Sequence, residues 1–194
     1  MKLKTSLLTM AMNLMFASAV LAAQTFEIDP SHASIGFTVD HLVISKVRGD
    51  FRDFSGTIEL DDQGAVQKVS SAIEVKSIDT NIQNRDEHLK SADFFDAENY
   101  PKISFQSKSV RQDGGESVLI GDLTIHGVTK EIELPFSVKG PVKGPNGETR
   151  IGFQASTVIN RKDFGMTWNK VLETGGLVVG EEVEISINLE AVGA

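Results

Sequence analysis

The sequence contains no cysteine in its 194 residues. A chain without cysteine forms no disulfide, carries no lipid on an N-terminal cysteine and has no thiolate nucleophile. Its stability must therefore come from packing and hydrogen bonding alone.

Positive charge is also scarce, because 19 lysine and arginine residues face 27 acidic ones and the net charge is −8. Two of those lysines and none of the acids lie in the first 22 residues, so the remainder carries a charge near −10. No basic cluster interrupts this balance, and such a chain repels phosphate backbones. These features exclude nucleic acid as an expected partner.

Familiar catalytic signatures are missing as well. The sequence has no Gly-x-Ser-x-Gly elbow, no His-Glu-x-x-His motif and no phosphate-binding loop. We therefore do not predict an enzyme, and we expect no cofactor. Four scattered histidines could still meet in space, which keeps a lipid-modifying enzyme as an alternative.

The first 22 residues have the layout of a secretory signal peptide, with two lysines followed by an uncharged, mostly apolar stretch over 7–20. Small residues follow, and we predict cleavage after Ala22 or Ala23. The alternative, a membrane anchor, needs about 20 apolar residues, whereas this stretch is short and contains Asn13. We expect an exported protein without a stable membrane anchor.

Apolar and polar residues alternate through much of the remaining chain. Alternation with a period of two places one face of a strand on the core and the other in water, which is typical of antiparallel sheets. The sequence therefore predicts one all-β domain over residues 23–194. The alternating segments are 35–39, 69–75, 132–138, 151–159 and 183–189.

Turn signals separate these segments. Asn146-Gly147 predicts a hairpin with a tight primed turn, and His126-Gly127 is a further turn candidate. Between Phe51 and Phe54 the apolar phase slips by one residue, which predicts a bulge or a sharp bend.

One short helix is predicted over residues 84–91. Asn84 fits as its N-cap, and Glu87 at the third position completes a pattern like a capping box. Arg85, Asp86 and His88 could form a metal or catalytic cluster, but their spacing matches no familiar ligand pattern. We expect them to fasten the helix over one end of the sheet structure.

About eight strands can close into a barrel or split into a sandwich, and the alternation alone does not decide between them. A closed barrel would remove exposed sheet edges. An eight-stranded barrel is filled by its own side chains or holds one slender ligand.

Several segments, taken in order, resemble the YceI-like family of bacterial periplasmic proteins. The resemblance spans essentially the whole chain after the first 22 residues. It implies a lipocalin-like antiparallel barrel of about eight strands, located in the periplasm, whose interior binds a polyisoprenoid or similar long-chain lipid. The segments are Asp29-Pro30-Ser31-His32-Ala33, 37–42, 45–51, 54–56, 78–80, 85–96, Tyr100-Pro101, 121–130 and 161–165.

Twelve residues are candidates for contact with such a lipid. Most are apolar and fall on inward-facing positions, and the alternative is that they pack into a dry core. His41 and Arg161 continue two inward-facing series and are candidates for contact with a polar head group, unless their strands end first. The candidates are Phe37, Val39, His41, Phe51, Phe105, Phe136, Phe153, Ala155, Ile159, Arg161, Phe164 and Trp168.

The expected function is therefore the binding, storage or transport of a long-chain apolar lipid, such as a polyisoprenoid, a quinone-like isoprenoid or a fatty-acyl chain. An envelope stress or interaction protein whose barrel is filled by its own side chains is the main alternative. Phe94 and Phe95, expected to be exposed, together with sheet edges, are compatible with a homodimer.

Overall fold

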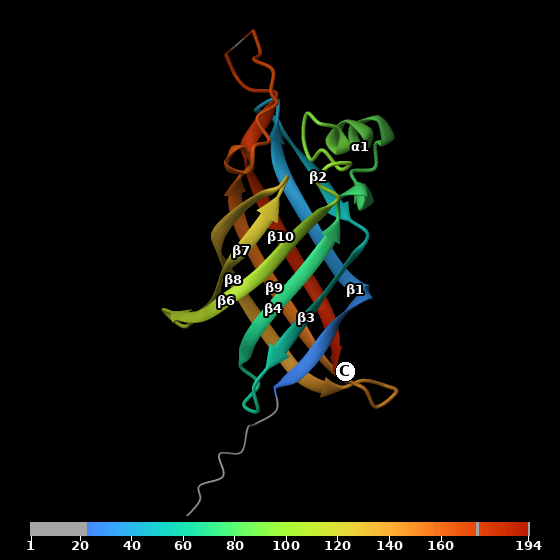
Figure 1. Cartoon of the computed structure of the whole chain (residues 1–194), viewed down its shortest axis with the longest axis vertical. Coiled ribbons are helices and arrows are strands. Elements are labelled where there is room, and N and C mark those ends of the chain that lie inside the picture. The colour runs from blue at the N-terminus through green and yellow to red at the C-terminus, as the bar shows by residue number, and fades with distance from the viewer. Residues whose placement is uncertain (1–22, 174, 194) are drawn as a thin grey trace, which may run out of the picture.

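A ring of antiparallel strands dominates the computed structural model, which describes residues 23–173 and 175–193 (Figure 1). The single α-helix of this part of the chain, α1, spans Gln83–Lys90, and two 3₁₀ turns span Val75–Ser77 and Arg161–Phe164. The strands are β1 (Gln24–His41), β2 (Ser45–Phe51), β3 (Phe54–Leu60), β4 (Val66–Glu74), β5 (Ile78–Asp79), β6 (Lys102–Asp113), β7 (Glu116–Ile125), β8 (Val128–Lys143), β9 (Thr149–Asn160) and β10 (Val179–Gly193).

The sheet closes on itself. Its order runs β10-β9-β8-β7-β6-β4-β3-β1, and β10 also pairs with β1 along most of the length of both strands. Eight strands thus form a barrel, as the resemblance implied, and β2 and β5 extend the sheet at one end. Closure gives every ring strand a partner on each side, which satisfies backbone N–H and C=O groups that a sandwich would leave at its edges.

The predicted bend between Phe51 and Phe54 is confirmed. β2 ends at Phe51 and β3 begins at Phe54, and the two strands lie one after the other along β1. Both phenylalanines are buried, so the extra residue between them lets the chain change direction while both rings stay inside.

The hairpin predicted at Asn146-Gly147 is present, but its turn type differs. Only Gly147 has a positive φ, of 86°, whereas a primed two-residue turn needs positive φ at both positions. Such a primed pair occurs instead at His126-Gly127, with φ of 51° and 72°, where Ile125 pairs directly with Val128. The strand register there leaves two residues for the turn, so even histidine takes a left-handed conformation.

The predicted helix is confirmed, but Asn84 is not its N-cap. The helix begins at Gln83 after Ile82, without a side-chain cap, and Glu87 accepts a bond from Gln83 Nε2 (2.9 Å). Asp86 instead accepts the backbone N–H of Thr80 (2.9 Å), and Arg85 donates to the Thr80 carbonyl (2.8 Å). A tertiary anchor at Thr80 therefore replaces the local cap, and it fastens the helix beside β5 as expected.

The two halves of the barrel interior differ. The half that contains the start of β1 and the end of β10 is tightly packed, with Phe26, Ile58, Ile151 and Ala191 at most 1% exposed. The other half, toward α1, is lined by side chains that are only partly buried, such as Ile185. The dry core and the hollow interior considered from sequence thus occupy opposite ends of one barrel.

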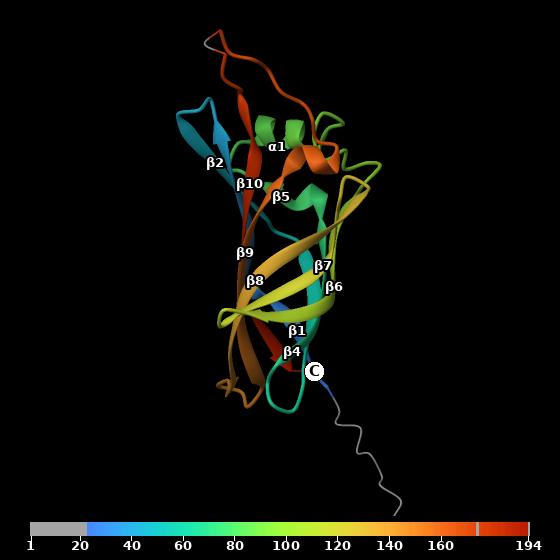
Figure 2. The ribbon, with the colours of Figure 1, turned by 90° about the vertical axis from the view of Figure 1, so that its left-hand side faces the viewer.

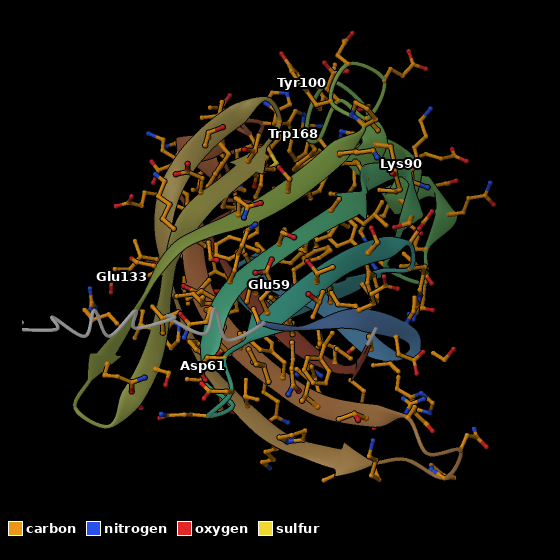
Figure 3. All side chains as sticks on the ribbon, turned by 60° about the horizontal axis from the view of Figure 1, so that its bottom comes forward. Glu59, Asp61, Lys90, Tyr100, Glu133 and Trp168 are labelled. Carbon is orange, nitrogen blue, oxygen red and sulfur yellow. The ribbon has the colours of Figure 1, made fainter. Side chains whose placement is uncertain are left out.

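The outer wall is polar, and the labelled Glu133 lies on it in Figure 3. Glu133 accepts two bonds from Arg111 (2.9 and 2.8 Å), and Lys108 lies 2.6 Å from Asp122. Exposed pairs of this kind contribute at most about 1 kcal/mol each, so the fold depends mainly on the interior.

An ion cluster ties the packed end together. Arg150 on β9 donates to Asp29 (2.8 Å), Glu148 (2.8 Å) and Glu190 (2.9 Å), and thereby joins β1, β9 and β10. The bond from Arg150 holds the pKa of Asp29 well below its ordinary value, with help from His32 and the Ser31 N–H. The same guanidinium lowers the pKa of Glu148.

We expect this cluster to make stability fall in acid. Because both carboxyl groups have lower pKa values in the folded than in the unfolded chain, their contribution is complete above the unfolded values of 3.8 and 4.5 and is lost as the pH falls below them. Asp29→Asn should therefore lower Tm at pH 7, and its gap to the wild type should narrow by pH 3. Thermal unfolding followed by circular dichroism measures both, and a gap independent of pH would contradict this linkage.

Candidate functional site: an apolar pocket in the barrel

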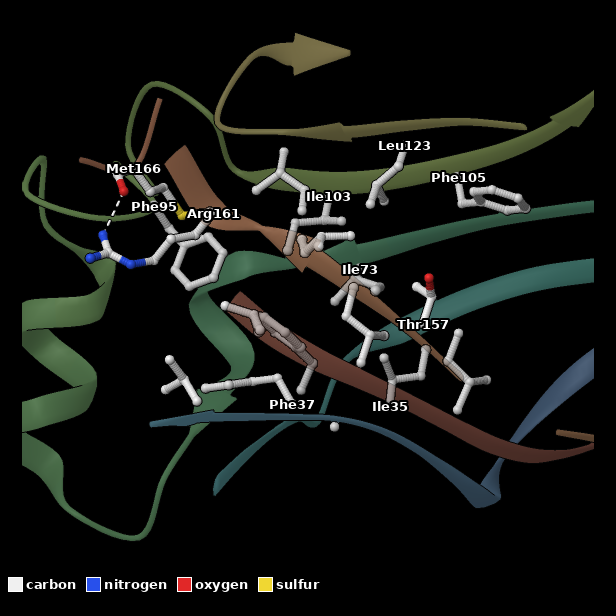
Figure 4. A pocket seen from close by; sticks show the side chains of 18 of the residues that line it. Ile35, Phe37, Ile73, Phe95, Ile103, Phe105, Leu123, Thr157, Arg161 and Met166 are labelled. Atoms are coloured by element: carbon white, nitrogen blue, oxygen red, sulfur yellow. Dashed lines mark hydrogen bonds between the residues drawn. The ribbon is translucent and has the colours of Figure 1, made fainter. Parts of the chain in front are cut away.

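The hollow half of the barrel is an elongated pocket that opens toward the α1 end (Figure 4). Its empty volume, including the open mouth, is about 1060 Å³, a size typical of small-molecule sites. Nearly all of its wall is aliphatic or aromatic, with Ser71, Thr157 and Arg161 as the polar side chains. The apolar side chains are Ile35, Phe37, Val39, Phe51, Ile73, Leu89, Phe94, Phe95, Ile103, Phe105, Leu123, Ile125, Ile132, Leu134, Ile159, Met166, Val179, Val183, Ile185 and Ile187.

Six of the twelve residues predicted from sequence line this pocket. They come from four strands and from the 3₁₀ turn after β9, and alternation placed each of them on the inner face. They are Phe37, Val39, Phe51, Phe105, Ile159 and Arg161.

Phe136, Phe153 and Ala155 lie outside the pocket lining. The Phe136 and Phe153 rings stack on each other with centroids 5.4 Å apart, and Phe153 is 2% exposed. Alternation tells which face of a strand a residue occupies but not its height along the barrel axis, so it cannot separate the hollow half from the packed half. Ligand contact by these three residues stays a prediction that the pocket geometry does not support.

The remaining three candidates lie near the α1 end without lining the pocket. His41 is partly exposed at the end of β1, where it pairs with Ser45. Phe164 is buried in the second 3₁₀ turn, and Trp168 follows it.

A lid over the pocket supplies the residues that strand patterns missed. Phe94 and Phe95 follow α1 and both line the pocket, and Phe94 is 6% exposed. The expectation that this pair is exposed is therefore wrong for Phe94. Its neighbours fold the segment back over the barrel, which alternation within strands cannot reveal. Two adjacent phenylalanines in a segment predicted as a loop were the available signal.

An aromatic cluster joins the two parts of this lid, the segment 83–101 and the segment 161–168. The Trp168 ring lies 5.1 Å from Phe94 and 4.9 Å from His88, measured between centroids. His88 also pairs with Asp93 at 2.8 Å. The helix cluster identified from sequence thus has a structural part in closing one end of the barrel.

Glycines keep the pocket open by letting phenylalanines lie against its wall. Gly49 is paired with Phe37 across the sheet, and a Cβ at this glycine would lie 2.6 Å from the Phe37 ring. Gly121 stands in the same relation to Phe105, at 2.7 Å. A larger residue at either position would force the ring toward the lumen, at a cost of about 1–3 kcal/mol for overpacking.

Arg161 is the charged side chain of the pocket wall. β9 ends at Asn160, yet the Arg161 side chain still turns inward and is 3% exposed. Its guanidinium donates to the carbonyls of Gly180 (2.8 Å), Met166 and Val179 (3.4 Å); Figure 4 draws the bond to Met166. Burial lowers its pKa. A guanidinium has five N–H groups, so these three bonds leave donors for a polar atom of a ligand.

Two searches of the described residues found nothing. No three or more histidine, aspartate or glutamate residues of the described ranges come together as candidate metal ligands. In the same residues, no helix has the length and apolar character needed to span a bilayer.

Comparison with known proteins decides the family. A family model described as a YceI-like domain matches residues 26–191. The chain belongs to the YceI-like family. Its curated relatives include Protein YceI of Escherichia coli, which is 38% identical over 194 residues and is aligned over 98% of each chain.

Solved structures of this fold agree with the barrel. Burkholderia cenocepacia BcnA superposes with a TM-score of 0.73 at 23% identity, covering 84% of this chain and 99% of that one. A polyisoprenoid-binding domain from Saccharophagus degradans gives a TM-score of 0.66 at 15% identity, covering 89% and 100%. At these identities the two structures support the fold of this YceI-like chain alone.

Proposed function

We propose that this YceI-like protein is exported to the periplasm and binds one long-chain apolar lipid, of the polyisoprenoid or fatty-acyl class, in its barrel for storage or transport. The observation that carries the proposal is the pocket, which is long, almost wholly apolar and open at one end. The predicted signal peptide supports export, and it lies outside the described residues.

The pocket wall suits a hydrocarbon chain. Burial of apolar surface is favourable by about 25 cal/mol per Å², and a chain with few polar groups gains little from any other interaction. The S. degradans neighbour, a polyisoprenoid-binding domain by name, favours a branched prenyl chain among the candidates.

Arg161 is the residue best placed to receive the polar end of the lipid. It lines the pocket near the lid, and its spare N–H groups can donate to a hydroxyl, carbonyl or phosphate oxygen. A chain bound in this way would have its head group at the α1 end and its tail toward the packed core.

Native mass spectrometry of the protein purified from the periplasm tests the proposal. We expect a stoichiometric adduct that organic extraction identifies as a long-chain species. A protein at its bare mass that also refuses added polyprenols and fatty acids would overturn the proposal and favour an interaction protein. A transit that leaves the chain uncleaved in the cytoplasm would overturn the assigned location.

A further inference from the structure

Large apolar side chains are exposed at the tip of the β1–β2 hairpin. Val43 is 72% exposed and Ile44 is 85% exposed. Leu42 and Val43 also have positive φ angles, of 54° and 64°, a conformation that costs energy for such residues and that hairpin tips normally assign to asparagine or glycine. The tip therefore carries a side-chain combination that favours neither folding nor solubility.

A second loop brings another exposed apolar residue to the same place. Val171, in the loop before β10, is 73% exposed. The Leu42 N–H donates to the Val178 carbonyl (2.9 Å), and a Cβ on Gly176 would lie 2.9 Å from Val43 Cγ2. Figures 1 and 2 both show this loop and the β1–β2 hairpin protruding together beyond the barrel. We name Val43, Ile44 and Val171 the apolar tip.

The apolar tip is continuous with the pocket. Val39, four residues before Val43, lines the pocket, and so does Val179 at the end of the second loop. The carbonyls of Val179 and Gly180 also accept bonds from Arg161. The two protruding loops are thus direct extensions of the pocket wall at its open end.

The residues around the tip have the chemistry of a membrane interface. Trp168 is partly buried with Lys170 5.9 Å above its ring, and tryptophan and lysine are both favoured at the boundary between water and hydrocarbon. The nearby Lys46 is engaged by Glu184 (2.6 Å), so it offers little free positive charge. Contact with a bilayer would therefore depend on apolar insertion and not on anionic lipids.

We propose that the apolar tip inserts into the surface of a phospholipid bilayer and holds the open end of the pocket against the membrane from which a lipid is taken or to which it is returned. This inference rests on the proposed function, because a water-insoluble chain has to pass between the pocket and a membrane. A second copy of the chain fits less well, since a standard interface buries roughly 800 Å² on each partner and a narrow tip of three side chains cannot supply it.

Flotation of the mature protein with phosphatidylcholine vesicles tests the proposal. We expect the wild type to bind, with little change when phosphatidylglycerol is added or when the ionic strength is raised. The double variant Val43→Ser/Ile44→Ser should bind at least tenfold more weakly, because each buried aliphatic side chain is worth about a factor of ten or more. The matched control is Val142→Ser/Val158→Ser, since these valines are 61% and 55% exposed and lie outside the tip.

Trp168 provides a second readout, because it is the single tryptophan of the sequence. Its emission should shift to the blue and be quenched by brominated phosphatidylcholine in the wild type and the control, but not in the tip variant. Equal binding by the tip variant and the control, or binding that requires phosphatidylglycerol and disappears in salt, would overturn the proposal. A dimer that dissociates in the tip variant without any vesicle binding would assign the tip to a second copy.

The two proposals fail in different ways. A protein that carries a stoichiometric lipid but ignores vesicles retains the proposed function and loses the docking surface. A protein that binds vesicles through the tip but never holds a lipid loses the proposed function, and its tip would then be a plain membrane contact.

Discussion

Ile185→Trp should abolish most lipid loading while leaving the barrel folded. Ile185 lies on β10, lines the pocket and is only partly buried, because its side chain faces the empty lumen and not a packed neighbour. An indole ring at this position would occupy space that a hydrocarbon chain needs, and a slender lumen offers no second path past it. We expect the stoichiometric adduct in native mass spectra to fall at least tenfold.

The neighbouring position supplies the control. Ser186 follows Ile185 on the same strand and is exposed on the outer wall, so Ser186→Trp adds the same ring without entering the pocket. Both variants should keep the circular dichroism spectrum of a β-barrel, and the control should load normally. Normal loading of a folded Ile185→Trp protein would show that the lipid does not lie in this pocket.

Arg161→Met should destabilise the protein by about 3 kcal/mol, because it leaves buried carbonyl groups without their donor. The carbonyls of Gly180 and Met166 lose a charge-assisted bond, and water has little access since Arg161 is 3% exposed. For a chain of this size we expect Tm to fall by roughly 6–12 °C. Thermal unfolding at pH 7 measures this loss.

Arg161→Lys is the informative comparison. Lysine keeps the charge but lacks the planar fork that reaches two loops at once, so it should recover only part of the stability. If Arg161 also receives a head group, both variants should retain less of a lipid with an anionic or hydroxyl end than of a plain hydrocarbon chain. A Tm within 2 °C of the wild type for Arg161→Met would contradict the structural role, because the carbonyls would then have found other donors.

The inner face of the barrel was predictable because alternation is a local property of the chain. Phe37, Phe105 and Ile159 each occupy an inward position in a strand, and each lines the pocket. The bend between Phe51 and Phe54 was readable for the same reason, since a slip of one residue in the pattern has one simple geometric consequence. The resemblance to the YceI-like family added the closed barrel, which alternation alone had left open.

The extent of the pocket was not predictable from such patterns. Phe153 and Phe37 both face inward, but Phe153 stacks on Phe136 in the packed half, whereas Phe37 lies flat over Gly49 and leaves the lumen free. The difference depends on which residues from other strands arrive at the same height, and the sequence of a single strand contains no such information.

The sequence by itself determined an all-β, cysteine-free, acidic chain with inward apolar faces, because those features depend on composition and on a period of two. Only the tertiary structure decided where the barrel is solid and where it is hollow. It also turned Phe94 inward as part of a lid and fastened α1 through Thr80 without a local cap. These outcomes depend on contacts between residues far apart in the chain, and packing at such contacts is settled only when the ring of strands closes.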